Sequence, residues 1–206
     1  MVINDDVKII ILIRHGQTNA SKERLLYGSK SKDEPINTEG INQIKRLTPF
    51  LKQYNPDTIY SSPMLRAVQT AEILVDTFRV QPIFLEDLRE IDFGDWEGRN
   101  FDKLSTIFPE EYNEWINSPQ TFTPPNGESV KHLYLRVESA LETILQNDFK
   151  TLFIVTHGGP IRVLLMKTLN VPLSHYWRIK IPHGSATYIE HANNQLSLQY
   201  MGQIGY

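Results

Sequence analysis

Short apolar runs alternate along the chain with longer segments whose apolar residues recur every three or four positions. The first run, VKIIILI at residues 7–13, consists mostly of β-branched residues, which is typical of a strand covered on both faces. The same reasoning predicts further strands, the last two as an antiparallel pair at the sheet edge, at residues 57–62, 81–86, 151–157, 185–191 and 196–201.

Four segments have the spacing of amphipathic helices. Residues 38–54 are predicted to form the first helix, and Pro49 is expected to kink or split it. The second is expected from about Pro63, with Ser62 as its N-cap and the proline at its first position. The other two are predicted over about 128–147 and from Gly158 to about Asn170.

Strands that alternate with helices predict an α/β fold with three layers, a doubly wound and mostly parallel sheet with helices on both faces. Residues 98–127 interrupt this alternation and are rich in aromatic side chains. We expect them to form a lid-like, helical and aromatic insertion over the active site rather than a second domain. The chain is therefore predicted to be a single domain over residues 1–206.

Composition and charge exclude several classes of function. A net charge of −3 gives no argument for nucleic acid or an anionic membrane as a partner. The chain has no cysteine, so thiolate catalysis, disulfides and cysteine-bound metals are excluded. The apolar run at 9–13 is too short for a signal peptide or a membrane span. We therefore expect a cytoplasmic protein in which any anion specificity comes from a local cluster of residues.

An arginine and a histidine stand side by side where the first predicted strand ends. Because adjacent strand residues face opposite sides, Arg14 and His15 cannot both be ordinary core residues. The second predicted strand leads to Arg66 on the first turn of a helix, and the fourth ends at His157 before Gly158. Ligands of open α/β sheets bind beyond the carboxyl ends of the strands. The sequence therefore predicts a compact cationic pocket for an anion at this edge.

Phosphate is the anion that suits these residue types. Arginine pairs bidentately with phosphate oxygens, and N–H groups at a helix N-terminus add donors. A neutral imidazole can attack phosphorus, and a nearby carboxylate would protonate the leaving oxygen and later activate water. The segment EDLREIDFGDWEG supplies the candidates for that carboxylate, which are Glu86, Glu90, Asp92, Asp95 and Glu97.

Six segments together resemble the histidine phosphatase superfamily, also called phosphoglycerate mutase-like. They are LIRHGQTNAS, DEPINTEG, IYSSPMLRAVQTAEIL, LREIDFGDWEGRNFDKL, PPNGESV and FIVTHGGPIRVLL, in the order that this family shows, over residues 9 to about 170. The sequence is most similar to the branch of alpha-ribazole-5'-phosphate phosphatases and broad-specificity phosphomonoesterases.

The resemblance implies a role for each matching residue. His15 would be the nucleophile that becomes phosphohistidine, and Glu90 would be the general acid and then the general base. Arg14, Arg66 and a protonated His157 would bind the phosphoryl group and stabilise its transition state. The Gly16 carbonyl would fix the His15 tautomer. The other substrate-binding positions would be Gln17, Thr18, Gly158 and Ser21, which stands where the family commonly has asparagine.

The activity that follows is a metal-independent and cofactor-independent hydrolysis of small-molecule phosphomonoesters through a phosphohistidine, with alpha-ribazole phosphate as one candidate substrate. Two alternatives stay open, a cofactor-dependent phosphoglycerate mutase and a non-catalytic phosphate-binding module. The oligomeric state is also open, with a homodimer among the alternatives. Because the segment 98–127 offers only Arg99 and Lys103 as cations, it suits a neutral or apolar leaving group. The remaining histidines, interpreted as structural or surface residues, are His132, His175, His183 and His191.

Overall fold

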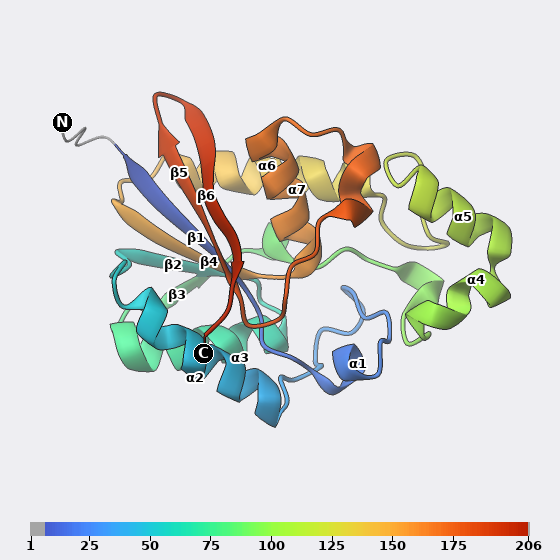
Figure 1. Cartoon of the computed structure of the whole chain (residues 1–206), viewed down its shortest axis with the longest axis horizontal. Coiled ribbons are helices and arrows are strands. Elements are labelled where there is room, and N and C mark those ends of the chain that lie inside the picture. Colours follow the sequence, from blue (N-terminus) through green and yellow to red (C-terminus); the bar gives the residue numbers. More distant parts are fainter. Residues whose placement is uncertain (1–6, 206) are drawn as a thin grey trace.

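A computed structural model describes residues 7–205, so residues 1–6 and 206 of the expected domain lie outside the described part. Its centre is one six-stranded sheet with the strand order β3-β2-β4-β1-β5-β6 (Figure 1). The strands are β1 (Lys8–Arg14), β2 (Thr58–Ser61), β3 (Pro82–Phe84), β4 (Thr151–Thr156), β5 (Ala186–Ala192) and β6 (Gln195–Gln203).

Five of the six strands of this sheet run in the same direction, and β5 runs opposite to them. The pairs β1–β4, β2–β4 and β2–β3 are parallel, whereas β1–β5 and β5–β6 are antiparallel. The predicted antiparallel pair at the end of the chain is therefore confirmed. Because Ala186 at the start of β5 pairs with Ile13 near the end of β1, the loop before β5 reaches the edge where the parallel strands end.

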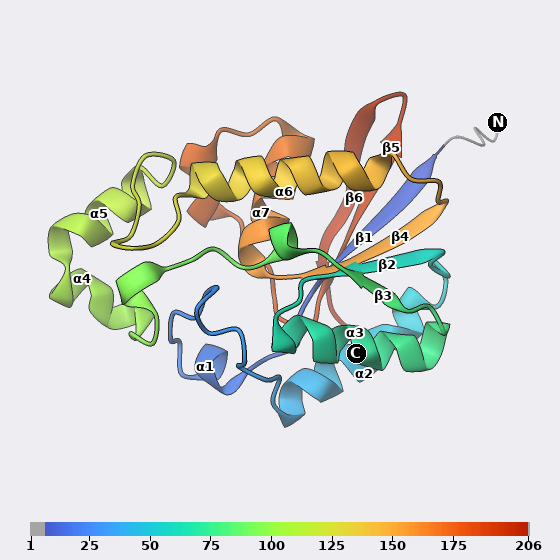
Figure 2. The ribbon, with the colours of Figure 1, turned by 180° about the vertical axis from the view of Figure 1, so that it is seen from behind.

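The predicted three-layer, doubly wound α/β fold is confirmed. Helices α2 (Thr38–Leu51) and α3 (Leu65–Phe78) cover one face of the sheet, and α6 (Val130–Leu145) and α7 (Gly158–Leu169) cover the other (Figures 1 and 2). The shorter helices are α1 (Asn19–Lys22), α4 (Leu104–Ile107), α5 (Pro109–Asn117) and four 3-10 helices at Glu86–Leu88, Gly94–Trp96, Phe101–Lys103 and Leu173–Arg178. No helix in the described range is long and apolar enough to cross a bilayer.

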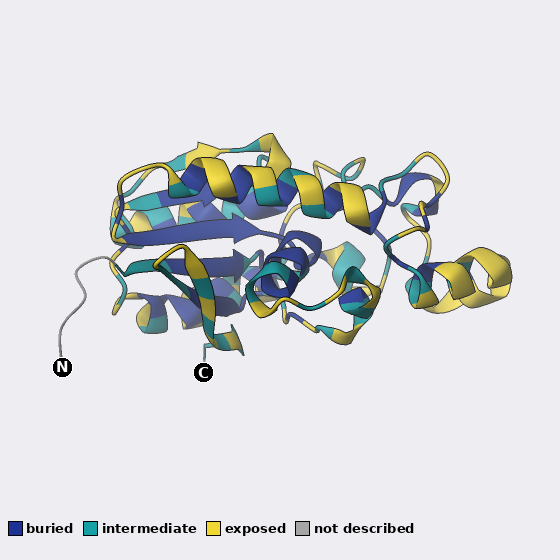
Figure 3. Ribbon diagram, turned by 90° about the horizontal axis from the view of Figure 1, so that it is seen from above, coloured by how far each residue is buried: buried dark blue, intermediate teal, exposed yellow. Residues whose placement is uncertain are grey.

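The alternation of side chains along β1 divides the core into two halves. Ile10 and Leu12 belong to the core under α6 and α7, while Ile11 and Ile13 belong to the core over α2 and α3. Figure 3 shows the central strands buried and the outer faces of the helices exposed. Burial on both faces explains why β1 is a continuous apolar run. The same alternation of side chains directs the next two residues, Arg14 and His15, toward different layers.

Two local predictions differ from the structure. Of the two alternatives for Pro49, a kinked or a split helix, the split is not seen, because Pro49 lies in the last turn of α2, which ends at Leu51. Ser62 is not a helix N-cap, since α3 begins at Leu65 with Met64 as the N-cap. The Ser62 hydroxyl lies 2.8 Å from Nε2 of His157 and also accepts the N–H of Met64 at 3.3 Å, so it joins the candidate site to the residue that precedes the helix.

The segment 98–127 contains helices α4 and α5, and both lie beyond the carboxyl ends of β1 and β4 (Figures 1 and 2). Trp115 of α5 is buried against Trp96, with ring centroids 5.2 Å apart. The indole N–H of Trp177 donates to the Trp115 carbonyl at 2.9 Å. These contacts attach the insertion to the segment that follows α7, so the two together border the strand edge.

Candidate active site

Four predicted site residues meet at the carboxyl edge of the sheet. Arg14 ends β1 and His15 follows it, while His157 follows β4, the parallel neighbour of β1. The rings of His15 and His157 have centroids 5.0 Å apart. Arg66 comes from the first turn of α3, and its Nε–H donates to Nδ1 of His157 at 3.2 Å. The structure therefore brings these four side chains into one cluster.

The backbone around His15 determines its tautomer. Nδ1 lies 2.8 Å from the carbonyl oxygen of Gly16, and a carbonyl only accepts, so Nδ1 carries the proton and Nε2 holds a free electron pair. The loop lies so close to α2 that a Cβ at position 16 would be 2.5 Å from the Gly40 carbonyl oxygen. Glycine at position 16 is therefore required for this close approach, which keeps the imidazole in a nucleophilic form.

His157 is neutral in the structure, which contradicts the expectation of a protonated residue. Its Nδ1 accepts the hydrogen bond from Arg66 and so carries no proton. Its Nε2–H therefore donates to the Ser62 hydroxyl. Burial, followed by the nearby charges of Arg66 and Arg14, holds the pKa of His157 well below its usual value. The expectation overlooked that an arginine donor removes one of the two protonation sites.

His15 and His183 are neutral for the same physical reason. Burial is the largest cause that lowers the pKa of His15, and the neighbouring His157 and Arg66 lower it further. Burial also holds the pKa of His183 well below its usual value, and Arg14 adds to this effect. The cluster therefore contains three imidazoles that resist protonation, first because they are buried and second because positive charges lie nearby.

The two arginines of the cluster have no carboxylate within 4 Å among the described residues. Arg66 is fully buried, donates to the carbonyls of Ser31 and Gly28, and lies under the ring of Tyr27 at 4.7 Å. The Nε of Arg14 is inaccessible to solvent and has no hydrogen-bond partner. Guanidinium groups in this state are prepared to receive an anionic ligand, because a buried charge needs a counter-charge.

Glu90 is the carboxylate next to this cluster. It is buried, and its Oε1 accepts hydrogen bonds from the N–H groups of Ile91 and Gly159, both at 3.0 Å. A Cβ at position 159 would lie 2.1 Å from Oε1, so glycine is needed there to admit the carboxylate. Oε2 makes one longer contact, 3.2 Å to the N–H of Gly159, and retains capacity to exchange a proton with a ligand.

Arg136 of α6 holds the segment that carries Glu90. Its guanidinium donates to the carbonyls of Asp87, Arg89 and Glu90 at 2.7, 2.9 and 3.1 Å. It also pairs bidentately with Glu128 at 2.7 and 2.8 Å. Five bonds from one planar group fix the path of this segment. Sequence reasoning missed this contact, although Glu128 lies in the PPNGESV motif.

The remaining predicted binding residues do not all lie at the cavity beside the cluster. The N–H of Gly158, at the first position of α7, has no partner within the described chain and is free to donate. Thr18 is buried and forms a capping box with Ser21 at the start of α1. The Gln17 side chain accepts from Asn37. Of Gln17, Thr18 and Ser21, the structure brings only Ser21 to the cavity beside the cluster.

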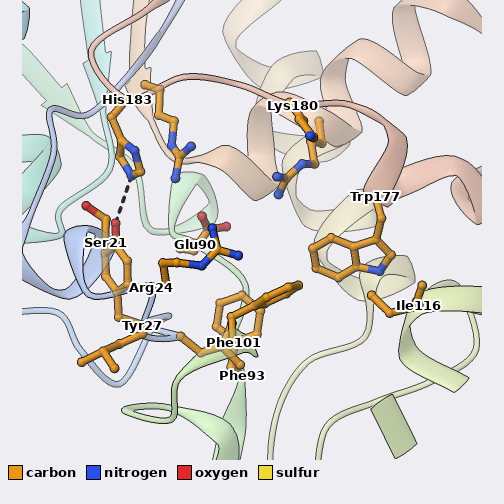
Figure 4. Close-up of a pocket in the computed structure, with 14 residues that line it drawn as sticks. Ser21, Arg24, Tyr27, Glu90, Phe93, Phe101, Ile116, Trp177, Lys180 and His183 are labelled. Carbon is orange, nitrogen blue, oxygen red and sulfur yellow. Dashed lines mark hydrogen bonds between the residues drawn. The ribbon is translucent and has the colours of Figure 1, made fainter. Parts of the chain in front are cut away.

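This cavity has a volume of about 400 Å³. Tyr27 and His183 line it, flank the ring of His15 at centroid distances of 6.2 and 5.3 Å, and are joined by a 3.2 Å hydrogen bond (Figure 4). The interpretation of His183 as structural or surface was therefore wrong. Arg162 and Lys180 also line the cavity, and neither was predicted from the sequence.

Comparisons with known proteins agree with this geometry. A family model described as the histidine phosphatase superfamily (branch 1) matches residues 10–204. An adenosylcobalamin/alpha-ribazole phosphatase of Salmonella typhimurium is 31% identical over 174 residues, covering 84% of this chain and 85% of that protein. Phosphoserine phosphatase 1 of Hydrogenobacter thermophilus is 28% identical over 200 residues, covering 95% and 94%. The crystal structure of an alpha-ribazole phosphatase from Shigella flexneri is 26% identical, with a TM-score of 0.84 and coverage of 95% and 96%.

The neutral histidines predict how stability depends on pH. Below about pH 6.5 the unfolded chain binds protons at His15, His157 and His183, whereas the folded chain, with lowered pKa values, does not. Each residue should therefore cost about 1.4 kcal/mol of unfolding free energy between pH 7.5 and 5.5. Urea denaturation at the two pH values measures the loss. We expect His183→Asn to remove about one third of the contribution of these histidines. An equal pH dependence in His183→Asn and the wild type would show that His183 is not held neutral by the fold.

Proposed function

Because the chain belongs to the histidine phosphatase superfamily, we propose that it hydrolyses small-molecule phosphomonoesters through a phosphohistidine formed on His15. One observation carries the proposal. The nucleophilic Nε2 of a neutral His15 lies in a cluster with two arginines that lack a carboxylate partner. The substrate phosphate is a dianion and supplies the counter-charge that Arg14 and Arg66 lack.

The proposed reaction has two displacements at phosphorus. In the first, Nε2 of His15 forms a bond to phosphorus, the bond to the ester oxygen breaks, and Glu90 gives its proton to the leaving oxygen. In the second, Glu90 takes a proton from water, the water oxygen bonds to phosphorus, and the bond to Nε2 breaks. The alcohol and inorganic phosphate are released with His15 and Glu90 restored. Arg14, Arg66 and the N–H of Gly158 stabilise the charge of the transferring group.

This charge distribution requires no metal ion. The guanidinium groups occupy the position in which many phosphoryl-transfer enzymes use magnesium, and they would repel a divalent cation. Within residues 7–205, no three histidine or carboxylate side chains are arranged as metal ligands. We therefore propose a metal-independent enzyme.

The insertion is proposed to act as the roof of the leaving-group cavity within a single domain. Phe101 and Ile116 of the segment 98–127 line this cavity together with Trp177 (Figure 4). Arg99 and Lys103 of the same segment do not line it. The roof therefore offers an apolar surface, while the cations of the cavity come from other elements.

A phosphoglycerate mutase is the second candidate, and one observation favours it. A mutase must hold the carboxylate of a phosphoglycerate far from the nucleophile, and Arg162 and Lys180 supply cations in the cavity. Hydrolysis is the leading proposal, because the two relatives compared above are named phosphatases. Alpha-ribazole phosphate and phosphoserine, the substrates named for those relatives, should be assayed as substrates beside a phosphoglycerate.

Replacement of the proposed nucleophile tests the mechanism. We expect His15→Ala to abolish hydrolysis of p-nitrophenyl phosphate and to leave no acid-labile phosphoprotein after a brief reaction with labelled substrate. The wild type should remain fully active in a chelator. His191→Ala is the matched control, because His191 pairs with Lys8 at the opposite end of β1. Phosphatase activity in a pure His15→Ala preparation would exclude a phosphohistidine at this position.

Replacement of the proposed acid should give a loss that depends on the leaving group. Glu90→Gln is expected to lower kcat about 10²–10⁴-fold with alkyl phosphates. With p-nitrophenyl phosphate the loss should be much smaller, because p-nitrophenolate leaves without protonation. Steady-state rates with the two substrate types measure the difference.

Glu86→Gln is the control for this experiment, since Glu86 belongs to the same segment and is exposed beside Arg89. Pre-steady-state measurement of the first phosphate-transfer step removes any contribution from dephosphorylation. Equal losses on both substrates in that step would assign proton transfer to a residue other than Glu90.

The products formed from 3-phosphoglycerate distinguish the two candidate activities. We expect glycerate and inorganic phosphate as the main products, with 2,3-bisphosphoglycerate added, because nothing in the proposed mechanism keeps water from the phosphohistidine. ³¹P NMR follows both reactions in one sample. Conversion to 2-phosphoglycerate at about 10–10³ s⁻¹ with only trace phosphate release would establish the mutase.

A further inference from the structure

The cavity beyond the phosphate cluster carries a positive charge that the proposed chemistry does not use. Figure 4 shows Tyr27 and His183 on one side of the cavity and Lys180 with Trp177 on the other. The side with Tyr27 and His183 adjoins His15, so the side with Lys180 faces the part of the substrate that leaves. The residues there should determine which leaving group is accepted.

Arg162 is held in place at this side. It projects from α7, and its Nε–H donates to the carbonyl of Ile179 at 2.8 Å. Its guanidinium lies 5.2 Å from the ring centroid of Tyr176 and 5.5 Å from that of Trp177. A guanidinium fixed by a hydrogen bond and two aromatic rings loses little entropy when it binds a ligand.

Lys180 adds a second cation from the loop that precedes β5. Its side chain is exposed, and neither Lys180 nor Arg162 has a carboxylate within 4 Å in the described part of the chain. The third outer cation, Arg24, is already paired with Asp102 at 2.6 Å. Arg162 and Lys180 are therefore the two cations of the outer cavity that lack a counter-charge.

The described residues that line the cavity include almost no acidic side chains. Among the residues 7–205 that line the cavity, Glu90 is the single carboxylate, and its oxygens accept backbone N–H groups. The chain as a whole has a net charge of −3, so this local excess of positive charge does not follow from composition. A leaving group with an ammonium ion would find no free carboxylate here, whereas one with a carboxylate would find two cations.

We propose that Arg162 and Lys180 form a carboxylate subsite, and that the substrate is a phosphorylated hydroxy acid without an amino group. The inference rests on the proposed phosphatase function and adds the chemical class of its leaving group. A cavity of about 400 Å³ accommodates a small molecule of this type. Trp177 and Phe101 cover the carbon skeleton between the ester oxygen and the carboxylate. The proposed subsite differs from the expectation of a neutral or apolar leaving group, which considered only the cations of the segment 98–127.

A matched pair of substrates tests the subsite. 3-Phosphoglycerate and glycerol 3-phosphate differ only in a carboxylate against a hydroxymethyl group. We expect the wild type to favour 3-phosphoglycerate by about tenfold or more in kcat/KM, the discrimination typical of a hydrogen bond to a charged group. Lys180→Gln should reduce this ratio at least threefold, and Lys180→Glu should bring it below one. Lys103→Gln, an exposed lysine of the insertion outside the cavity, should leave the ratio unchanged.

Two readouts separate failure of the subsite from failure of the proposed function. A wild-type ratio near one, or a ratio unaffected by Lys180→Glu while p-nitrophenyl phosphate is still hydrolysed, would overturn the subsite alone. If no phosphomonoester is hydrolysed, the proposed function fails, and calorimetric binding to the wild type tests the subsite by itself. Tighter binding of 3-phosphoglycerate than of glycerol 3-phosphate, weakened by Lys180→Gln, would then support it, and equal binding would contradict it.

Discussion

Two guanidinium groups without a carboxylate partner are the feature on which the rest of this site depends. Arg66 is fully buried, and the Nε of Arg14 is inaccessible and unpartnered. Removal of such charges from water costs several kcal/mol for each ion. Burial, followed by nearby positive charges that include these two, holds the pKa values of His15 and His157 well below their usual value. The positive charge that is proposed to attract a phosphate dianion therefore also helps to preserve the electron pair that would attack it.

The fold supports this arrangement through contacts that lie outside the cluster. Parallel pairing of β1 with β4 places His15 beside His157, and the close approach of Gly16 to Gly40 sets the loop that orients the His15 ring. Arg136 fixes the segment that carries Glu90 from the opposite layer. The site is thus assembled from both faces of the sheet and is held by contacts within the protein itself, and preorganisation of this kind is the condition for strong electrostatic stabilisation of a transition state.

The part of the site on parallel strands could be predicted from the sequence, because the order of strands and helices fixes where such strands end. This reasoning placed Arg14, His15, Arg66 and His157 at one edge, and the structure brings them together, while their catalytic roles stay predictions. It failed for His183 and Lys180, because β5 runs antiparallel to β1 and enters the sheet at the edge where the parallel strands leave it. The loop before such a strand therefore lies at the carboxyl edge of the parallel strands, where the candidate site is. Arg162 was missed for another reason, because the sequence of a helix does not indicate which cavity an arginine side chain lines.

The central claim is that phosphoryl transfer proceeds through His15 in two in-line displacements. The stereochemical course at phosphorus measures this most directly, with an isotopically chiral ¹⁶O,¹⁷O,¹⁸O phosphate monoester as donor and an alcohol such as propane-1,2-diol as acceptor. Each in-line displacement inverts the configuration, so transfer through a phosphoenzyme returns the starting configuration. Retention of configuration in the product ester is therefore expected. Inversion would show a single direct displacement and would contradict a phosphohistidine intermediate.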